Sequence, residues 1–288
     1  MKGLYSIVEK FPYSTLQKIV LPPLIEEVSK SSPISHFVLP ILLLVAKNQT
    51  QGEFSHLLLP HLKKTFGSQE PRILYVLINN MHVLLQKCDE ETKQNSLFPI
   101  LSRCLSLNQP KLNNASLLIL PQIFSLAKNE SLFSDVFSSL LTLASKTQVG
   151  VIRVNLITCL SKLQVSNEIY SAFFVPILKT VLSEDQQNVE LVKVCFSFAI
   201  LVATQTRDIT LICKYLIPTL SPLLPLLFSE KSEVYFEFTA SLLSLIKITE
   251  SIKKDTERPK SVRRDVEDVT GKDFSPSSSF FLECIKIF

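Results

Sequence analysis

Hydrophobic positions along the chain form six stretches that recur at nearly constant spacing. Five of them contain a proline that follows two apolar residues: Pro22, Pro60, Pro99, Pro176 and Pro218. In the sixth stretch, DVFSSLL, the equivalent position is Ser138, so the successive intervals are 38, 39, 39, 38 and 42 residues. A repeat of about 40 residues is typical of a chain built from copies of one helical unit.

A second series of apolar segments lies between the first. Its members begin at Ile41, Val76, Leu118, Val154, Cys195 and Ser241. Two apolar segments in every 40 residues or so are typical of stacked helical hairpins of HEAT or armadillo type, because a single hairpin cannot bury its apolar face alone. The sequence therefore predicts an all-α fold, a HEAT/armadillo-type α-solenoid of about six helical hairpins.

Each unit is expected to consist of a helix A with the proline, a turn, a helix B and a linker. The A helices are predicted at 15–29, 53–66, 92–106, 131–145, 168–183 and 208–228. The B helices are predicted at 34–47, 72–88, 113–128, 150–163, 188–204 and 233–249. A proline inside a helix costs about 3 kcal/mol. Its recurrence predicts a kink at the same place in each A helix, with loop prolines as the alternative.

The character of the chain changes near residue 250. Residues 253–273, KKDTERPKSVRRDVEDVTGKD, are rich in both charges and contain few large apolar side chains. Such a segment cannot bury enough surface to order itself. We expect a solenoid over 1–250 and a flexible charged tail over 251–288 that ends in the apolar segment Phe280–Phe288. Docking on the solenoid, binding a partner and an arbitrary chain end all stay open for that segment.

Composition excludes few partners and favours a soluble, cytoplasmic protein. The net charge is +4, and no basic block indicates binding to nucleic acid. Mean hydropathy is +0.27, but the longest apolar runs, Phe37–Ala46 and Leu216–Phe228, are shorter than the ~20 residues of a transmembrane helix. The N-terminus lacks the apolar core of a signal peptide.

No residue pattern indicates catalysis, a metal or a cofactor. The six cysteines are widely spaced, without a CxxC motif or a Cys/His cluster, as expected for buried reduced thiols. The four histidines are His36, His56, His61 and His82, and none has convergent partners at metal-ligand spacing. The prediction is a protein that is not an enzyme.

One set of basic residues recurs with the repeat. Arg72, Lys111, Arg153 and Lys193 follow one another at intervals of 39, 42 and 40 residues, each near the start of a B helix. In stacked hairpins, equivalent positions line up as a ladder. The ladder either fixes the stacking through hydrogen bonds to neighbouring turns or forms a positive stripe for an acidic peptide or phospholipid headgroup. A second row, at the ends of the B helices, suits the negative end of the helix dipole: Lys47, Lys87, Lys128, Lys162 and Lys247.

Several segments resemble the HEAT-repeat region of the Scy-like pseudokinases, most of all the coated-vesicle-associated branch. In order, they are KGL near the start, KIVLPPL, HFVLPILLLVAKN, LLLPHLKKTFGSQEP, FPILSRCLS and VIRVNLITCLSKL. The resemblance covers roughly residues 2–220. The kinase-like domain that precedes this region in the family is absent, with no Gly-rich loop, VAIK-like lysine, HRD or DFG. We expect the chain to be the repeat region of such a protein.

The resemblance implies a non-catalytic scaffold in vesicle traffic between the trans-Golgi network, endosomes and plasma membrane. Members of that branch associate with clathrin and its adaptor complexes, so peripheral association with Golgi, endosomes or coated vesicles is expected. Other branches serve coatomer traffic or tRNA export. Because fold does not determine function, another HEAT adaptor stays open: a nuclear transport or tRNA export factor, or a phosphatase scaffold.

Overall fold

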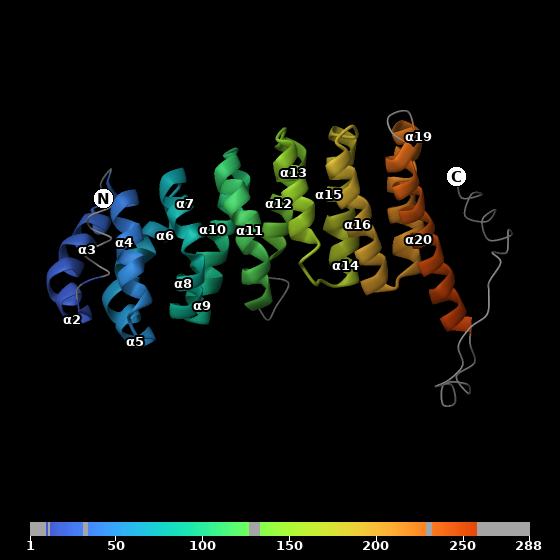
Figure 1. The fold of residues 1–288 in the computed structure, drawn as a ribbon. Helices are drawn as coiled ribbons and strands as arrows, with labels where there is room; N and C mark the ends of the chain where they lie inside the picture. The colour runs from blue at the N-terminus through green and yellow to red at the C-terminus, as the bar shows by residue number, and fades with distance from the viewer. Residues whose placement is uncertain (1–9, 11, 31–33, 127–132, 229–231, 258–288) are drawn as a thin grey trace. The chain divides into compact units, whose positions relative to one another are not determined.

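The computed structural model describes residues 10, 12–30, 34–126, 133–228 and 232–257. Within these ranges the chain forms helices joined by turns and loops and contains no β-strand, as Figure 1 shows. The predicted all-α fold is therefore confirmed. The chain divides into two compact units, Met1–Leu191 and Val192–Phe288.

In the first unit, two sets of helices alternate along the chain. The A helices are α2 (Tyr13–Thr15), η1 (Leu16–Val20) and α3 (Leu21–Ser29); α5 (Gln51–Glu53), η2 (Phe54–Leu58) and α6 (Leu59–Phe66); α9 (Glu90–Thr92), η3 (Lys93–Leu97) and α10 (Phe98–Ser106); α12 (Ser134–Lys146); and α14 (Asn167–Ile169), η5 (Tyr170–Phe174) and α15 (Val175–Glu184). The B helices are α4 (Ser35–Lys47), α7 (Pro71–Asn79) with α8 (Met81–Lys87), α11 (Pro110–Leu126) and α13 (Gly150–Leu160). Helix α16 (Val189–Thr206) begins in this unit and continues into the second.

Consecutive hairpins of the first unit pack side by side in two layers (Figure 1). In the A layer, α3 contacts α6, and α12 contacts both α10 and α15. In the B layer, α7 contacts α4 and α11, and α11 also contacts α13. Helices of the same hairpin pair across the layers, as α3 does with α4. Each hairpin thus buries its apolar face against the next, as in a solenoid.

Aromatic side chains fill the space around α12. The ring of Phe133 lies 5.1 Å from that of Phe98 in the preceding A helix and 5.0 Å from that of Phe124 in α11. Phe137 of α12 lies 5.8 Å from Phe174 in the following A helix. Such pairs contribute about 0.5–1.5 kcal/mol each beyond the area they bury. The cluster therefore links three successive hairpins.

A π-helical turn precedes each of the five recurring prolines. In these turns, the residue before the proline donates its backbone N–H to the carbonyl five residues back, as Phe98 does to Lys93 and Val175 to Tyr170. A proline ring would collide with the carbonyl four residues back in an α-helix. The extra residue of a π turn widens the backbone at that point. The predicted kink therefore takes the form of a local π turn, and the prolines lie within helices.

The A helix without a proline has no π turn. Helix α12, which contains Ser138 at the equivalent position, is α-helical from Ser134 to Lys146. A proline alone does not impose a π turn, because Pro40 and Pro121 lie inside the continuous α-helices α4 and α11. The π turn belongs to the A helices that contain the proline.

The second unit contains the rest of α16, followed by α17 (Ile209–Leu211), η6 (Ile212–Leu216), α18 (Ile217–Leu220), α19 (Leu223–Phe228) and α20 (Ser232–Glu257). Asp208 accepts hydrogen bonds from the N–H groups of Thr210 and Leu211, at 2.8 and 3.1 Å, and caps α17 as the sequence predicts. The rings of Phe196 and Phe238 stack 4.9 Å apart and join α16 to α20.

Three predicted boundaries differ from the structure. Helix α20 continues to Glu257, so residues 251–257 are helical although the sequence assigns them to the tail. The predicted helix 208–228 is interrupted after Leu220, near Pro222, which has no N–H to continue it. The predicted helix 72–88 is interrupted at Asn80. The segment Phe280–Phe288 lies outside the described residues.

Candidate protein-binding surface

The B helices of the first unit contain cations but no carboxylates. Helices α4, α7, α8, α11 and α13 have no Asp or Glu. They carry Lys47, Arg72, Lys87, Lys111 and Arg153. The A helices contain both charges, and further carboxylates lie in the loops between the layers, such as Glu70 and Asp185. The two layers therefore differ in charge, and the B layer favours an anionic partner.

A groove of about 530 Å³ lies between α7 and α11. Its walls combine apolar, amide and cationic side chains: Tyr75, Ile78, Asn79, Lys111, Asn114, Ala115, Leu118, Ile119 and Gln122. Tyr75 is 44% exposed and Leu118 is 65% exposed. Large apolar side chains that stay in contact with water beside polar groups are typical of binding surfaces.

An amide pair joins α11 to α13 beside this groove. Asn155 Nδ2 donates a hydrogen bond to Asn114 Oδ1 at 2.6 Å. This bond uses one polar atom of each half-buried side chain. Asn114 Nδ2 and Asn155 Oδ1 have no protein partner among the described residues. One donor and one acceptor are therefore available at the edge of the groove.

The four residues of the predicted basic ladder occupy different helical positions. Arg72 and Lys111 are the second residues of α7 and α11, and both side chains are exposed. Arg153 is the fourth residue of α13, and Lys193 is the fifth of α16. Each step along a helix turns the side chain by about 100°. A difference of two positions therefore directs Arg153 away from the direction of Arg72 and Lys111, although the sequence intervals are similar.

Arg153 is buried, with 5% of its surface exposed, and it contacts the end of the next A helix. Its Nη1 lies 3.6 Å from Asp185 Oδ2, and its Nη2 lies 3.9 Å from Glu184 Oε2. A buried cation is tolerated only when carboxylates are close to it. Arg153 thus joins α13 to the loop after α15, and this contact is of the stacking kind that the sequence left open.

Lys193 makes an ion pair in the second unit. Its Nζ lies 2.8 Å from Glu237 Oε1 on α20, and both side chains are about half exposed. Arg72 and Lys111 make no ion pair among the described residues. The structure therefore separates two paired cations from two that face solvent on the B layer.

The second predicted row of lysines also divides. Lys47 and Lys162 are exposed at or just after helix ends, and Lys87 Nζ donates a hydrogen bond to the carbonyl of Gln49 in the preceding repeat. Lys247 lies inside α20 and not at its end, because the helix is longer than predicted. Lys128 lies outside the described residues.

A third basic series, in the A layer, was missed by the sequence analysis. Lys64 Nζ donates to the carbonyl of Ser29 at 3.2 Å, and Arg103 Nη2 donates to the carbonyl of Phe66. Each donor reaches the C-terminal end of the preceding A helix, where carbonyls lack intrahelical partners. The interval from 64 to 103 matches the repeat and was the available signal.

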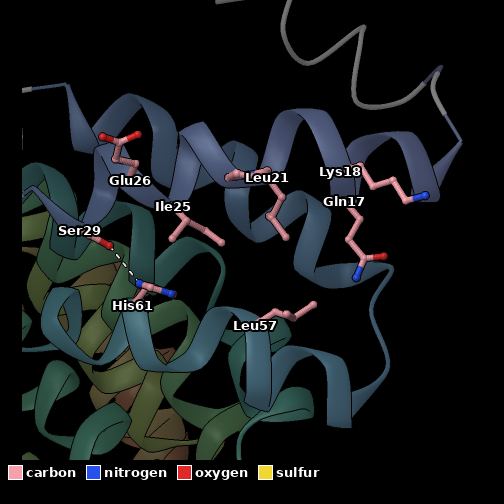
Figure 2. Close-up of a pocket in the computed structure, with 9 residues that line it drawn as sticks. Gln17, Lys18, Leu21, Ile25, Glu26, Ser29, Leu57 and His61 are labelled. Atoms are coloured by element: carbon pink, nitrogen blue, oxygen red, sulfur yellow. Dashed lines mark hydrogen bonds between the residues drawn. The ribbon is translucent and has the colours of Figure 1, made fainter.

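A second groove, of about 690 Å³, lies between the first two A helices (Figure 2). Leu21, Ile25 and Leu57 line it, and Ser29 Oγ and His61 Nδ1 are hydrogen-bonded at 3.1 Å at one end. A catalytic Ser–His pair would need a carboxylate to orient the imidazole. The carboxylate in this groove, Glu26, pairs with Lys30 Nζ at 2.6 Å, which lowers its pKa. The Ser29–His61 bond therefore links two neighbouring A helices.

The cysteines in the described part of the chain form no disulfide. Burial raises the pKa of three of them to about 12 from the usual 9.0; these buried thiols are Cys88, Cys104 and Cys159. Burial also raises the pKa of Cys195. A nucleophilic or metal-binding cysteine needs the thiolate form, which burial disfavours at all four sites. In the same described ranges, no three Cys, His, Asp or Glu side chains lie close enough together to hold a metal ion.

Helix α16 is the one helix in the described ranges whose length and apolar character suffice to cross a membrane. A packed core helix meets the same criteria. Its buried residues follow the helical period, with Leu191, Cys195, Ala199 and Val202 on one side, whereas Lys193 and Ser197 are exposed. This periodic burial is typical of a helix packed against protein.

Comparison with known proteins found similarity to SCY1-like protein 2 of human and of mouse. In each case the chain is 30% identical over 163 residues, which is 56% of this chain and 17% of the relative. The match is shorter than the stretch 2–220 over which the sequence shows its resemblance. No protein-family model and no solved structure matches the chain. The resemblance to Scy-like proteins is thereby confirmed, for a part of SCY1-like protein 2 that corresponds to about half of this chain.

Proposed function

We propose that this chain is a non-catalytic protein-interaction scaffold that acts in clathrin-dependent vesicle traffic between the trans-Golgi network and endosomes. The similarity to SCY1-like protein 2 is the observation that carries this proposal. It covers a minor part of that protein, so partners and location are assigned by proposal. The stacked hairpins support a scaffold, because such arrays present extended faces to other macromolecules.

The side-chain chemistry supports a binding role in preference to a catalytic one. The buried thiols are held in the neutral form, and Ser29–His61 has no orienting carboxylate beside it that is not already paired. The B-helix face offers apolar, amide and cationic groups over several helices. In this proposal the protein is cytoplasmic and reaches Golgi, endosomal or coated-vesicle membranes through its protein partners.

Affinity capture tests the proposal. The full chain is immobilised and exposed to cell lysate, and bound proteins are quantified by mass spectrometry against a thermally unfolded sample of the same chain. Enrichment of clathrin or adaptor-complex subunits is expected. Enrichment of nuclear transport cargo, tRNA-export factors or phosphatase subunits in their place would replace the proposal with another adaptor function.

A further inference from the structure

We propose that the groove between α7 and α11 binds an extended, acidic peptide segment that carries a large apolar side chain. This inference rests on the proposed scaffold function and specifies the chemistry of the partner. It does not depend on which cellular pathway supplies that partner. Three independent features of the groove carry it: its charge, its unused amide groups and its exposed apolar side chains.

The charge of the B layer selects an acidic partner. Arg72 and Lys111 are exposed and unpaired in the described part of the chain. The five B helices that lie wholly in the first unit have no carboxylate of their own to neutralise these cations. Both cations lie in the first turn of a helix, where the dipole favours anions, so helix stability does not explain their position. An acidic segment would supply the missing counter-charges and be attracted over a distance of about 10 Å.

The amide pair selects a peptide backbone. Asn114 Nδ2 is a donor and Asn155 Oδ1 is an acceptor, and the hydrogen bond between the two side chains holds them in place. An extended peptide presents one N–H and one C=O per residue on its edges. A fixed donor beside a fixed acceptor matches that pattern, as side chains do when they pair with an added strand.

The exposed apolar groups provide the anchor. Tyr75 and Leu118 lie on the two helices that line the groove and are 44% and 65% exposed. Ile78 and Ile119 extend the apolar lining below them. Binding energy at such surfaces comes mainly from a large side chain that fills a central apolar site, with charges at the rim. The partner should therefore place an aromatic residue or a leucine between acidic residues.

A peptide fits these features better than an anionic membrane does. Electrostatic attachment to lipid headgroups requires about four to eight clustered Lys or Arg side chains, whereas this groove has Arg72 and Lys111 at its ends. An extended chain rises about 3.3 Å per residue, and packed helices lie about 8–10 Å apart. A segment of about ten residues would therefore span α4, α7, α11 and α13.

The test is selection from a phage-displayed library of random peptides of about that length, with the full chain as bait. Enriched sequences should contain Asp or Glu on both sides of a large apolar residue. A fluorescein-labelled peptide of the enriched sequence is then titrated by anisotropy. The double variant Arg72→Glu, Lys111→Glu should weaken binding by at least tenfold, and Leu118→Ser should do the same. Binding should weaken further as salt rises.

The control is the double variant Lys63→Glu, Lys146→Glu, which makes the same charge change on exposed A-layer positions and should leave the affinity within twofold. Circular dichroism checks that each variant is folded. Failure to enrich any peptide, enrichment of basic peptides, or equal loss in the control overturns the inference. Binding to phosphatidylserine vesicles that depends on Arg72 and Lys111, without peptide enrichment, also overturns it. Capture of coat proteins from lysate is a separate result and can fail or succeed independently.

Discussion

Placing a proline in α12 tests why five of the A helices contain a π turn. The change is Ser138→Pro, at the position where the other A helices have their proline. Ser138 is exposed, so the ring would meet solvent and not a neighbouring helix. Its N–H is expected to bond the carbonyl of Ser134 in the continuous α-helix. A proline removes that bond and places its ring against the same carbonyl.

The magnitude follows from helix propensities. Proline in a helix interior costs about 3 kcal/mol relative to alanine, and serine costs about 0.5 kcal/mol, so the substitution should destabilise α12 by about 2.5 kcal/mol. The solenoid is stabilised by local terms and contacts between neighbours, so the effect should be concentrated in α12 and the hairpins beside it. Because 1.4 kcal/mol corresponds to a factor of ten, amide hydrogens of α12 should exchange roughly 60-fold faster.

Hydrogen exchange read by mass spectrometry on peptides from α12 measures this effect. The control is Ser138→Ala, which keeps the N–H and removes only the hydrogen bond from Ser138 Oγ to the Ser134 carbonyl at 2.9 Å. It should exchange no faster than the parent. Helices α4 and α11 accommodate Pro40 and Pro121 without a π turn. If Ser138→Pro accelerates exchange less than about fivefold, α12 can do the same, and the π turns are not needed to accept proline.

Three further predictions concern buried groups. Arg153→Glu should destabilise the first unit by at least about 3 kcal/mol, because it places a third carboxylate beside Glu184 and Asp185; Lys193→Glu should cost about 1 kcal/mol or less in urea unfolding, because its pair is exposed. Asn113→Ala should cost about 2 kcal/mol, since its buried Nδ2 lies 2.9 Å from the carbonyls of Cys104 and Leu107 at the end of α10, and urea unfolding measures this as well. The raised pKa of the buried thiols means that the folded chain keeps protons that the unfolded chain loses as pH rises from about 9 towards 12, so the free energy of unfolding should fall over that range, and a thiol reagent at pH 8 should modify these cysteines only after denaturation; rapid labelling of the native chain would contradict their burial.

The repeat spacing was sufficient to predict the helices but not their internal geometry. The predicted B helix 34–47 and the predicted A helix 92–106 agree with α4 and with α9–η3–α10 to within two residues, because apolar periodicity marks the buried face directly. The π turns could not be predicted, since a proline signals only that the α pattern is disturbed and not how the backbone accommodates it. Pro121, which lies in a regular α-helix, shows that the residue alone does not decide.

The surface was predictable in its chemistry but not in its register. Recurrence at about 40 residues identified Arg72, Lys111, Arg153 and Lys193 as a set, yet linker lengths vary by one or two residues between repeats. A shift of two residues turns a side chain by about 200°, which is enough to exchange a buried position for an exposed one. Counting from the first residue of each B helix would have separated Arg153 from the others. The absence of carboxylates from the B segments was visible in the sequence and was the signal that pointed to the groove.

Lys111 offers a way to separate stability from binding. It is the second residue of α11, where a cation opposes the positive end of the helix dipole by about 0.3–1 kcal/mol. It is exposed, and no acidic residue precedes it in the loop Leu107–Gln109. Lys111→Glu should therefore raise the free energy of unfolding by up to about 1 kcal/mol at low salt, with a smaller gain at high salt. The same variant should weaken binding of the acidic peptide. A residue that costs stability where it stands and improves binding is expected at a functional surface. Urea unfolding at two salt concentrations measures the first effect, and a loss of stability in Lys111→Glu would show that this cation supports the fold through a contact of its own.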